Sequence, residues 1–291
     1  MEVEYTHVLG IHENKTINID KRVPVNGTCC TAPLNGVTAP NGKAQFASVR
    51  NEESIGRSHY DGINFSYRQR MWRHFSLNAN YTAAWAYSYG AGGGSFRNYP
   101  KDPANPFASW EWGPNPNDER HHVTISGLWE LPYGFQLSPI MQYGSARPYD
   151  VTNSSNTINV GGGSAVGVIV PDNDPTNFFA FAGNNAGAQN CYYGLNGVQQ
   201  NCRFASFDPL RGDPFFQLDL RLAKNIKFGE RLNVQIVGQA FNLTNRANYG
   251  NNYNNSIGDA ASFGHPSGFI NPASTIIPRS LWGEFGVRLT F

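Results

Sequence analysis

The sequence predicts an all-β protein, an antiparallel transmembrane β-barrel segment of about eight strands. Composition is the first observation: the 291 residues include 19 Phe, 14 Tyr and 31 Gly but only 3 Met, which favours strands and turns over helices. Alternation is the second: segments whose side chains alternate between apolar and polar recur along the whole chain. No stretch approaches the roughly 18 continuous apolar residues that a membrane helix needs.

The last segment, residues 281–291, reads LWGEFGVRLTF and alternates cleanly. Successive side chains of a strand point to opposite faces. Phe285, Val287, Leu289 and Phe291 therefore form an apolar face that requires a core or lipid. Glu284 and Arg288 form a polar face that requires water or a polar lumen. Taken alone, the segment fits an amphipathic strand of a soluble sandwich equally well.

Residues 75–87 show the longest alternation, with Phe75, Leu77 and Ala79 opposite small polar residues. In a membrane barrel the apolar row faces lipid and the polar row faces the lumen. The residues predicted to face the lumen are Ser76, Asn78, Asn80, Thr82, Asp219, Arg221, Glu284 and Arg288.

The other strands are expected at residues 2–9, 58–70, 122–131, 135–149, 216–223 and 232–240. Short turns are expected at residues 71–73, at residues 132–134 and near Gly229, and long loops at residues 10–56, 90–119, 151–212 and 245–279. Short and long connections alternate without exception. Soluble sandwiches seldom hold loops this long, whereas outer-membrane barrels combine short periplasmic turns with long extracellular loops.

The near-zero net charge of +1 gives no electrostatic case for a nucleic-acid partner. The first ten residues, MEVEYTHVLG, have neither the basic region nor the apolar core of a signal peptide. They predict either a cytoplasmic protein or the downstream piece of an exported one.

Residues 215–250, FFQLDLRLAKNIKFGERLNVQIVGQAFNLTNRANYG, resemble the penultimate barrel hairpin of TonB-dependent receptors of the Oar-like group, including the element AFNLTN at residues 240–245. Residues 58–70, SHYDGINFSYRQR, and residues 120–151, RHHVTISGLWELPYGFQLSPIMQYGSARPYDV, resemble earlier hairpins of the same barrel. The resemblance runs from about residue 3 to residue 291.

The resemblance implies that residues 1–291 are the C-terminal portion of an outer-membrane β-barrel that takes part in energy-coupled passage of an unidentified ligand. It implies contact with outer-membrane lipid, with the remaining barrel strands and the plug, and with the barrel assembly machinery. In this family the assembly machinery recognises the last strand, which here carries Phe285, Val287, Leu289 and Phe291. Full receptors also carry a signal peptide, a TonB-contacting segment, a plug and ~22 strands. The first three are missing here, so contact with the TonB complex is expected only through an upstream region.

Two other classes stay open at this point. A stand-alone eight-stranded barrel with an adhesive or structural role is the first, because eight strands can close around packed side chains. The small polar row at residues 76–88 suits a wide lumen better. A soluble lectin-like β protein is the second.

Catalytic chemistry is not expected. His121 and His122 are adjacent, so they point to opposite faces, and Asp172 and Asp174 lack the Gly and closing Glu of a calcium loop. We expect no enzyme activity, no metal and no cofactor.

The four cysteines are the last feature of the sequence. We predict a disulfide between Cys191 and Cys202, which lie in one presumed extracellular loop with Gly194 and Gly197 between them. Cys29 and Cys30 are adjacent, and their pairing is left open.

Overall fold

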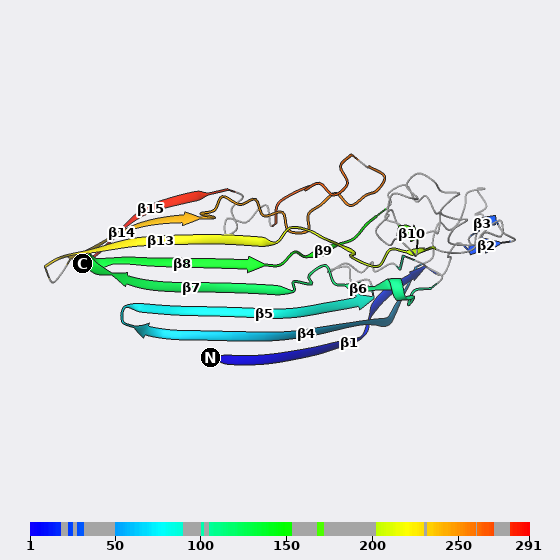
Figure 1. Ribbon diagram of the computed structural model, residues 1–291, viewed down its shortest axis with the longest axis horizontal. Helices are drawn as coiled ribbons and strands as arrows, with labels where there is room; N and C mark the ends of the chain where they lie inside the picture. The colour runs from blue at the N-terminus through cyan, green and yellow to red at the C-terminus, as the bar shows by residue number, and fades with distance from the viewer. Residues whose placement is uncertain are drawn as a thin grey trace, which may run out of the picture.

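The fold is known from a computed structural model, which describes residues 1–18, 23–25, 28–31, 50–89, 100–101, 105–152, 168–171, 202–229, 232–259, 261–270 and 280–291. Its main feature is one antiparallel sheet in which the strands follow the order β1-β4-β5-β7-β8-β13-β14-β15, with β6 paired to β5. Along this path, each strand pairs with the strands of the path that come before and after it in the sequence, as Figure 1 shows. The all-β antiparallel fold predicted from the alternation is therefore confirmed.

The strands of the main sheet are β1 (Glu2–Asn18), β4 (Arg50–Trp72), β5 (Phe75–Tyr89), β6 (Trp112–Pro114), β7 (His121–Leu131), β8 (Phe135–Gly144), β13 (Phe215–Phe228), β14 (Leu232–Phe241) and β15 (Trp282–Thr290). Three small pairs lie outside it: β2 (Val23–Val25) with β3 (Thr28–Thr31), β9 (Pro148–Tyr149) with β12 (Leu210–Arg211), and β10 (Ile169–Pro171) with β11 (Cys202–Phe204). Two 3-10 turns, η1 (Ser109–Glu111) and η2 (Pro132–Gly134), are the helical elements of the described residues, and none of these residues forms a helix able to cross a membrane.

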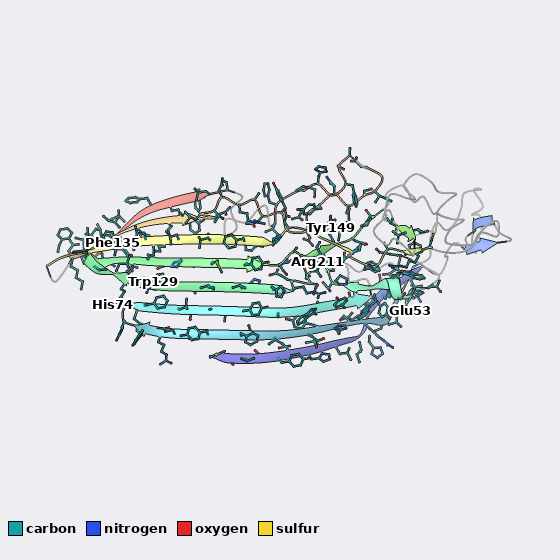
Figure 2. All side chains as sticks on the ribbon, viewed as in Figure 1. Glu53, His74, Trp129, Phe135, Tyr149 and Arg211 are labelled. Carbon is teal, nitrogen blue, oxygen red and sulfur yellow. The ribbon has the colours of Figure 1, made fainter. Side chains whose placement is uncertain are left out.

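The short turns gather at one end of the sheet and the long connections at the other, as the chain order predicts (Figure 1). Arg73 and His74 close the β4–β5 turn with φ of 47° and 70°, and Gly134 closes the β7–β8 turn with φ of 78°. A side chain at Gly134 would also meet the carbonyl oxygen of Asn225 at 2.6 Å, so this turn requires glycine. In Figure 2, His74, Trp129 and Phe135 lie at the turn end, and Glu53, Tyr149 and Arg211 lie toward the other end.

The predicted boundaries of three elements are wrong. The loop expected at residues 10–56 is strand on both flanks, because β1 and β4 stay paired as far as Asn18 and Arg50. Two register shifts, between Ile11 and Glu13 and between Glu13 and Asn14, interrupt the side-chain alternation beside His12, which has a φ of 58°, and hide the strand. The strand expected at residues 135–149 ends at Gly144, and the strand expected at residues 216–223 runs from Phe215 to Phe228.

The sheet is open in this structure. β1 pairs with β4 alone and β15 with β14 alone among the described strands, and these two strands form opposite edges in Figure 1. The described hydrophobic cluster lies outside the sheet, where Val151, Val168, Val170, Ala205 and Ile257 pack together. The connections at the long-loop end thus contain a small core of their own. We call the described loop segments around these five residues the loop unit.

Candidate functional site

The sheet has one polar and one apolar face. Register places Asn80 opposite Thr124, which lies opposite Gln142, which in turn lies opposite Gln217. One residue further along, Tyr81 lies opposite Val123, which in turn lies opposite Tyr143. On the polar face lie all eight residues predicted to line the lumen: Ser76, Asn78, Asn80, Thr82, Asp219, Arg221, Glu284 and Arg288.

Two groups form within these eight. Asn80 accepts a hydrogen bond of 2.9 Å from Ser66 Oγ, and Thr82 donates one of 3.1 Å to Asn64, so the β5 row is tied to β4. Arg221, Glu284 and Arg288 come together around a hollow of about 420 Å³ between β13 and β15. Their place in the wall of a lumen stays a prediction.

Asp219 also has a structural role, which the sequence did not predict. Its carboxylate accepts hydrogen bonds from Gln217 Nε2 and, at 2.8 Å, from the backbone N–H of Asn242. Asn242 is fully buried, has a φ of 51°, and donates through its side chain to the carbonyl of Arg246. Asp219 therefore fixes the turn at the start of the AFNLTN element, where the chain leaves β14.

The apolar positions of β15 are open to the surroundings. Phe285, Val287, Leu289 and Phe291 are 75%, 58%, 60% and 99% exposed. They belong to β15 and the residue after it, and β15 pairs with β14 alone among the described strands. Their role as an assembly signal stays a prediction.

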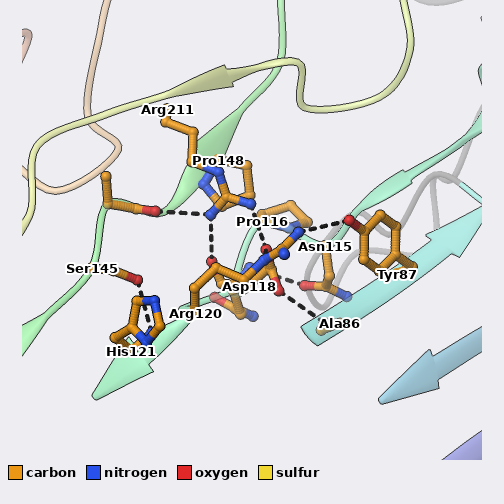
Figure 3. Close-up of polar contacts among 12 residues, drawn as sticks. Ala86, Tyr87, Asn115, Pro116, Asp118, Arg120, His121, Ser145, Pro148 and Arg211 are labelled. Carbon is orange, nitrogen blue, oxygen red and sulfur yellow. Dashed lines mark hydrogen bonds and ion pairs between the residues drawn. The ribbon is translucent and has the colours of Figure 1, made fainter. Parts of the chain in front are cut away.

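At the long-loop end, Asp118 ties the sheet to the loop unit (Figure 3). In the gap between the β5–β6 and β5–β7 pairings, the Ala84 N–H and the Ala86 carbonyl bond to the backbone of Arg120 and Asn115, and the Ala86 N–H donates to Asp118 Oδ1 at 2.8 Å. Its other oxygen, Oδ2, accepts hydrogen bonds from Arg120 Nε at 2.8 Å and from Arg211 Nη2 at 2.6 Å. The Asp118 side chain is fully buried, so its charge depends on these two guanidinium groups.

A second carboxylate lies on the polar face beside this centre. Glu119 pairs with His122 and with Arg147, whose Nη2 lies 2.9 Å from Glu119 Oε2. Burial opposes ionisation of Glu119, but the hydrogen bonds from His122 and Arg147 outweigh it and hold its pKa below the ordinary value. Tyr60, Thr82 and these residues line a pocket of about 280 Å³.

A buried ion cluster holds the loop unit together. Lys101 Nζ lies 2.6 Å from Asp150 Oδ1, donates to the carbonyl of Ser206 at 2.9 Å, and has a side chain only 3% exposed. Asp208 lies nearby. Burial raises the pKa of Asp208 to about 7, helped by the negative charge of Asp150 and opposed by Lys101.

The histidines point to opposite faces, as adjacency predicts. His121 Nδ1 lies 2.9 Å from the hydroxyl of Tyr81 on the apolar face, whereas His122 contacts Glu119 on the polar face. In the part of the chain that the structure describes, no group of three or more His, Cys, Asp or Glu could hold a metal ion. Asp172 and Asp174 lie outside the described residues.

Cys202 is disulfide-bonded. Cys191 and the side chains of Cys29 and Cys30 lie outside the described residues, so the pairing of Cys191 with Cys202 stays a prediction.

A sheet with one apolar and one polar face, with tight turns at one end and long loops at the other, defines a membrane β-barrel protein. The family model for the outer membrane beta barrel domain matches residues 1–281. The chain belongs to this family, and its place is the outer membrane. No curated protein sequence matches the chain.

Sequence reasoning missed Asp118, Arg120, Arg147 and Arg211 as a connected set. Residues 118–122, DERHH, form a charged run at the start of β7, and this run was the available signal. Arg211 lies 93 positions from Asp118, and only the folded sheet brings the two together.

Proposed function

We propose that the chain supplies eight strands to the barrel of a TonB-dependent receptor of the Oar-like group. In this role it would take part in energy-coupled passage of an unidentified ligand across the outer membrane. The observation that carries the proposal is the open sheet, whose edge strands β1 and β15 each have one neighbour among the described strands.

Unpaired edges are costly in lipid. A backbone N–H or C=O left without a partner in hydrocarbon costs several kcal/mol. A sheet of this kind therefore needs further strands or must close on itself. The small polar side chains at Ser76, Asn78, Asn80 and Thr82 leave much of a narrow eight-stranded interior unfilled, which favours further strands and a wide lumen that holds a plug.

The partners that follow from this proposal are outer-membrane lipid, the remaining strands and plug of the receptor, and the barrel assembly machinery at β15. The TonB complex would act through a region upstream of the barrel. We propose no catalytic role, because the clustered charges around Asp118 and Lys101 are occupied in tying segments together.

A stand-alone small barrel with an adhesive or structural role is the second candidate. β1 and β15 lie at the two ends of an antiparallel order and run in opposite directions, so they could pair directly with each other. The loop unit, with its own core and ion cluster, would then be the adhesive surface.

Expression of residues 1–291 behind an added signal peptide in a Gram-negative host separates the two candidates. The receptor proposal expects aggregation or protease sensitivity, because the edges have no neighbours. A complete small outer-membrane barrel carrying the same signal peptide controls for export and assembly. A monomeric, heat-modifiable and protease-resistant product would contradict the receptor proposal and support the stand-alone barrel.

A further inference from the structure

A pocket on the apolar face, at the long-loop end, has a composition that neither barrel closure nor transport explains. It encloses about 630 Å³, and its described lining includes aliphatic Leu9, Ile11 and Ile55, aromatic Tyr89 and Phe107, and the cation Arg57. We call it the Arg57 pocket. We propose that it binds an outer-leaflet lipid whose phosphorylated headgroup carries a net negative charge.

Register places the pocket on the outward side of the barrel wall. Ile11 lies opposite Arg57, and Leu9 lies opposite His59, which lies opposite Tyr87. Along β4, Arg57 shares its face with Phe65, the partner of Tyr81. This is the apolar face, which an outer-membrane barrel turns to lipid. The pocket is therefore continuous with the lipid-facing surface.

The height of the pocket follows from strand geometry. Phe75 stacks on Trp129 near the short turns, and Trp85 lies ten positions further along β5. At ~3.3 Å per residue and a tilt of ~45°, this interval covers ~23 Å of membrane depth, close to the ~25 Å apolar band of such barrels. Tyr89 lies four positions beyond Trp85, or ~9 Å higher. That depth is the headgroup layer of the outer leaflet.

Arg57 is exposed and forms no hydrogen bond or ion pair with the rest of the described chain. Two carboxylates of the same strand are occupied: Asp61 accepts hydrogen bonds from Tyr5 and His7 at 2.7 Å each, and Glu53 accepts one from Asn51 at 2.6 Å. His12 also lines the pocket, with its Nδ1 3.2 Å from the carbonyl oxygen of Ser54. No carboxylate belongs to the described lining, so the pocket favours an anion.

The apolar part of the pocket matches the acyl chains of a lipid, and its cationic part matches the phosphate of the headgroup. The guanidinium of Arg57 can bind two phosphate oxygens at once. The aliphatic residues, together with Tyr89 and Phe107, whose rings meet edge to face at 5.3 Å, offer a surface for an acyl chain. This inference rests on membership of the outer-membrane barrel family and is independent of the receptor proposal.

The test uses the protein extracted from the outer membrane in which it naturally assembles, stripped of lipid and placed in phosphatidylcholine nanodiscs. The phosphorylated glycolipid extracted from the same outer membrane is titrated in, and bound lipid is counted by native mass spectrometry. We expect one tightly held lipid per protein. Arg57→Gln should weaken its binding by about tenfold, the effect of losing one charged hydrogen-bond partner.

Arg68→Gln is the matched control, because Arg68 is an exposed cation of the same strand on the opposite face. It should leave lipid binding unchanged. Phe107 lies outside the strands, and Phe107→Ala should also weaken lipid binding. The test therefore does not depend on one variant assembling correctly.

Three results would overturn the proposal. They are wild-type binding by both Arg57→Gln and Phe107→Ala, equal competition by phosphatidylcholine, and displacement of the lipid by millimolar inorganic phosphate alone, which would indicate a site for free phosphate.

Discussion

Replacing Asp118 with alanine should release the loop unit from the sheet. The substitution removes the acceptor of the Ala86 N–H and leaves Arg120 and Arg211 without their shared carboxylate. Breaking a buried ion pair by removing one partner costs about 3–5 kcal/mol. The cost is local, because the strand pairings of the main sheet do not pass through Asp118.

Hydrogen exchange at the Ala86 amide reports this cost directly. At about 1.4 kcal/mol per factor of ten, the amide should exchange about two to three and a half orders of magnitude faster in Asp118→Ala. Asp118→Asn should fall in between, because its amide oxygen can still accept the Ala86 N–H but carries no charge. Asp259→Asn, a change at an exposed carboxylate of the same end of the molecule, serves as the control and should leave the Ala86 rate unchanged.

An Ala86 exchange rate that changes less than about threefold in Asp118→Ala would refute this reasoning. The gap between the β5–β6 and β5–β7 pairings would then be closed by the backbone alone, and Asp118 would be a bystander.

Three further predictions concern the loop unit and the last strand. The folded protein holds a proton on Asp208 up to a pKa of about 7, far above the ordinary 3.8, so loop-unit stability should fall as pH rises from about 4 to about 7. In thermal unfolding, Asp208→Asn should lose this dependence of stability on pH. An unchanged dependence would assign it to other groups. Deleting Phe291 should reduce outer-membrane assembly, measured by heat-modifiability, far more than Thr290→Ser does, and equal assembly would leave β15 an ordinary edge strand. Peptide mapping of oxidised protein should find Cys191 linked to Cys202, a closure worth ~2–3 kcal/mol, and unlinked cysteines would rule the pairing out.

The sequence predicted the sheet well where one face meets lipid and the other does not. In residues 75–87 the alternation follows that difference, and β5 covers this range with the expected faces. The turn at residues 132–134 was also predictable, because Pro and Gly mark it.

Alternation weakens where a strand extends beyond the apolar band of the membrane. The upper parts of β1 and β4 carry polar residues on both faces, and the register shifts beside His12 break the remaining period. The strand ends beyond residues 10 and 56 were missed for this physical reason, and no propensity pattern replaces the lost signal.

Of the site, the sequence predicted which face each polar residue occupies but not which residues meet. Arg221, Glu284 and Arg288 share a hollow because β13, β14 and β15 pair in one register. The contact between Asp118 and Arg211 depends on how a loop folds back onto the sheet. Single-sequence patterns contain no information on such contacts.

The central claim is that the polar face of the sheet lines the lumen and the apolar face meets lipid. Arg substitutions at Ala79 and Asn78, adjacent residues near the middle of the membrane-spanning part of β5, test it most directly. Assembly in the outer membrane should be impaired by Ala79→Arg, at a cost of ~2–4 kcal/mol near the midplane, and should tolerate Asn78→Arg. Equal assembly of the two variants, or greater harm from Asn78→Arg, would contradict the orientation of the barrel wall.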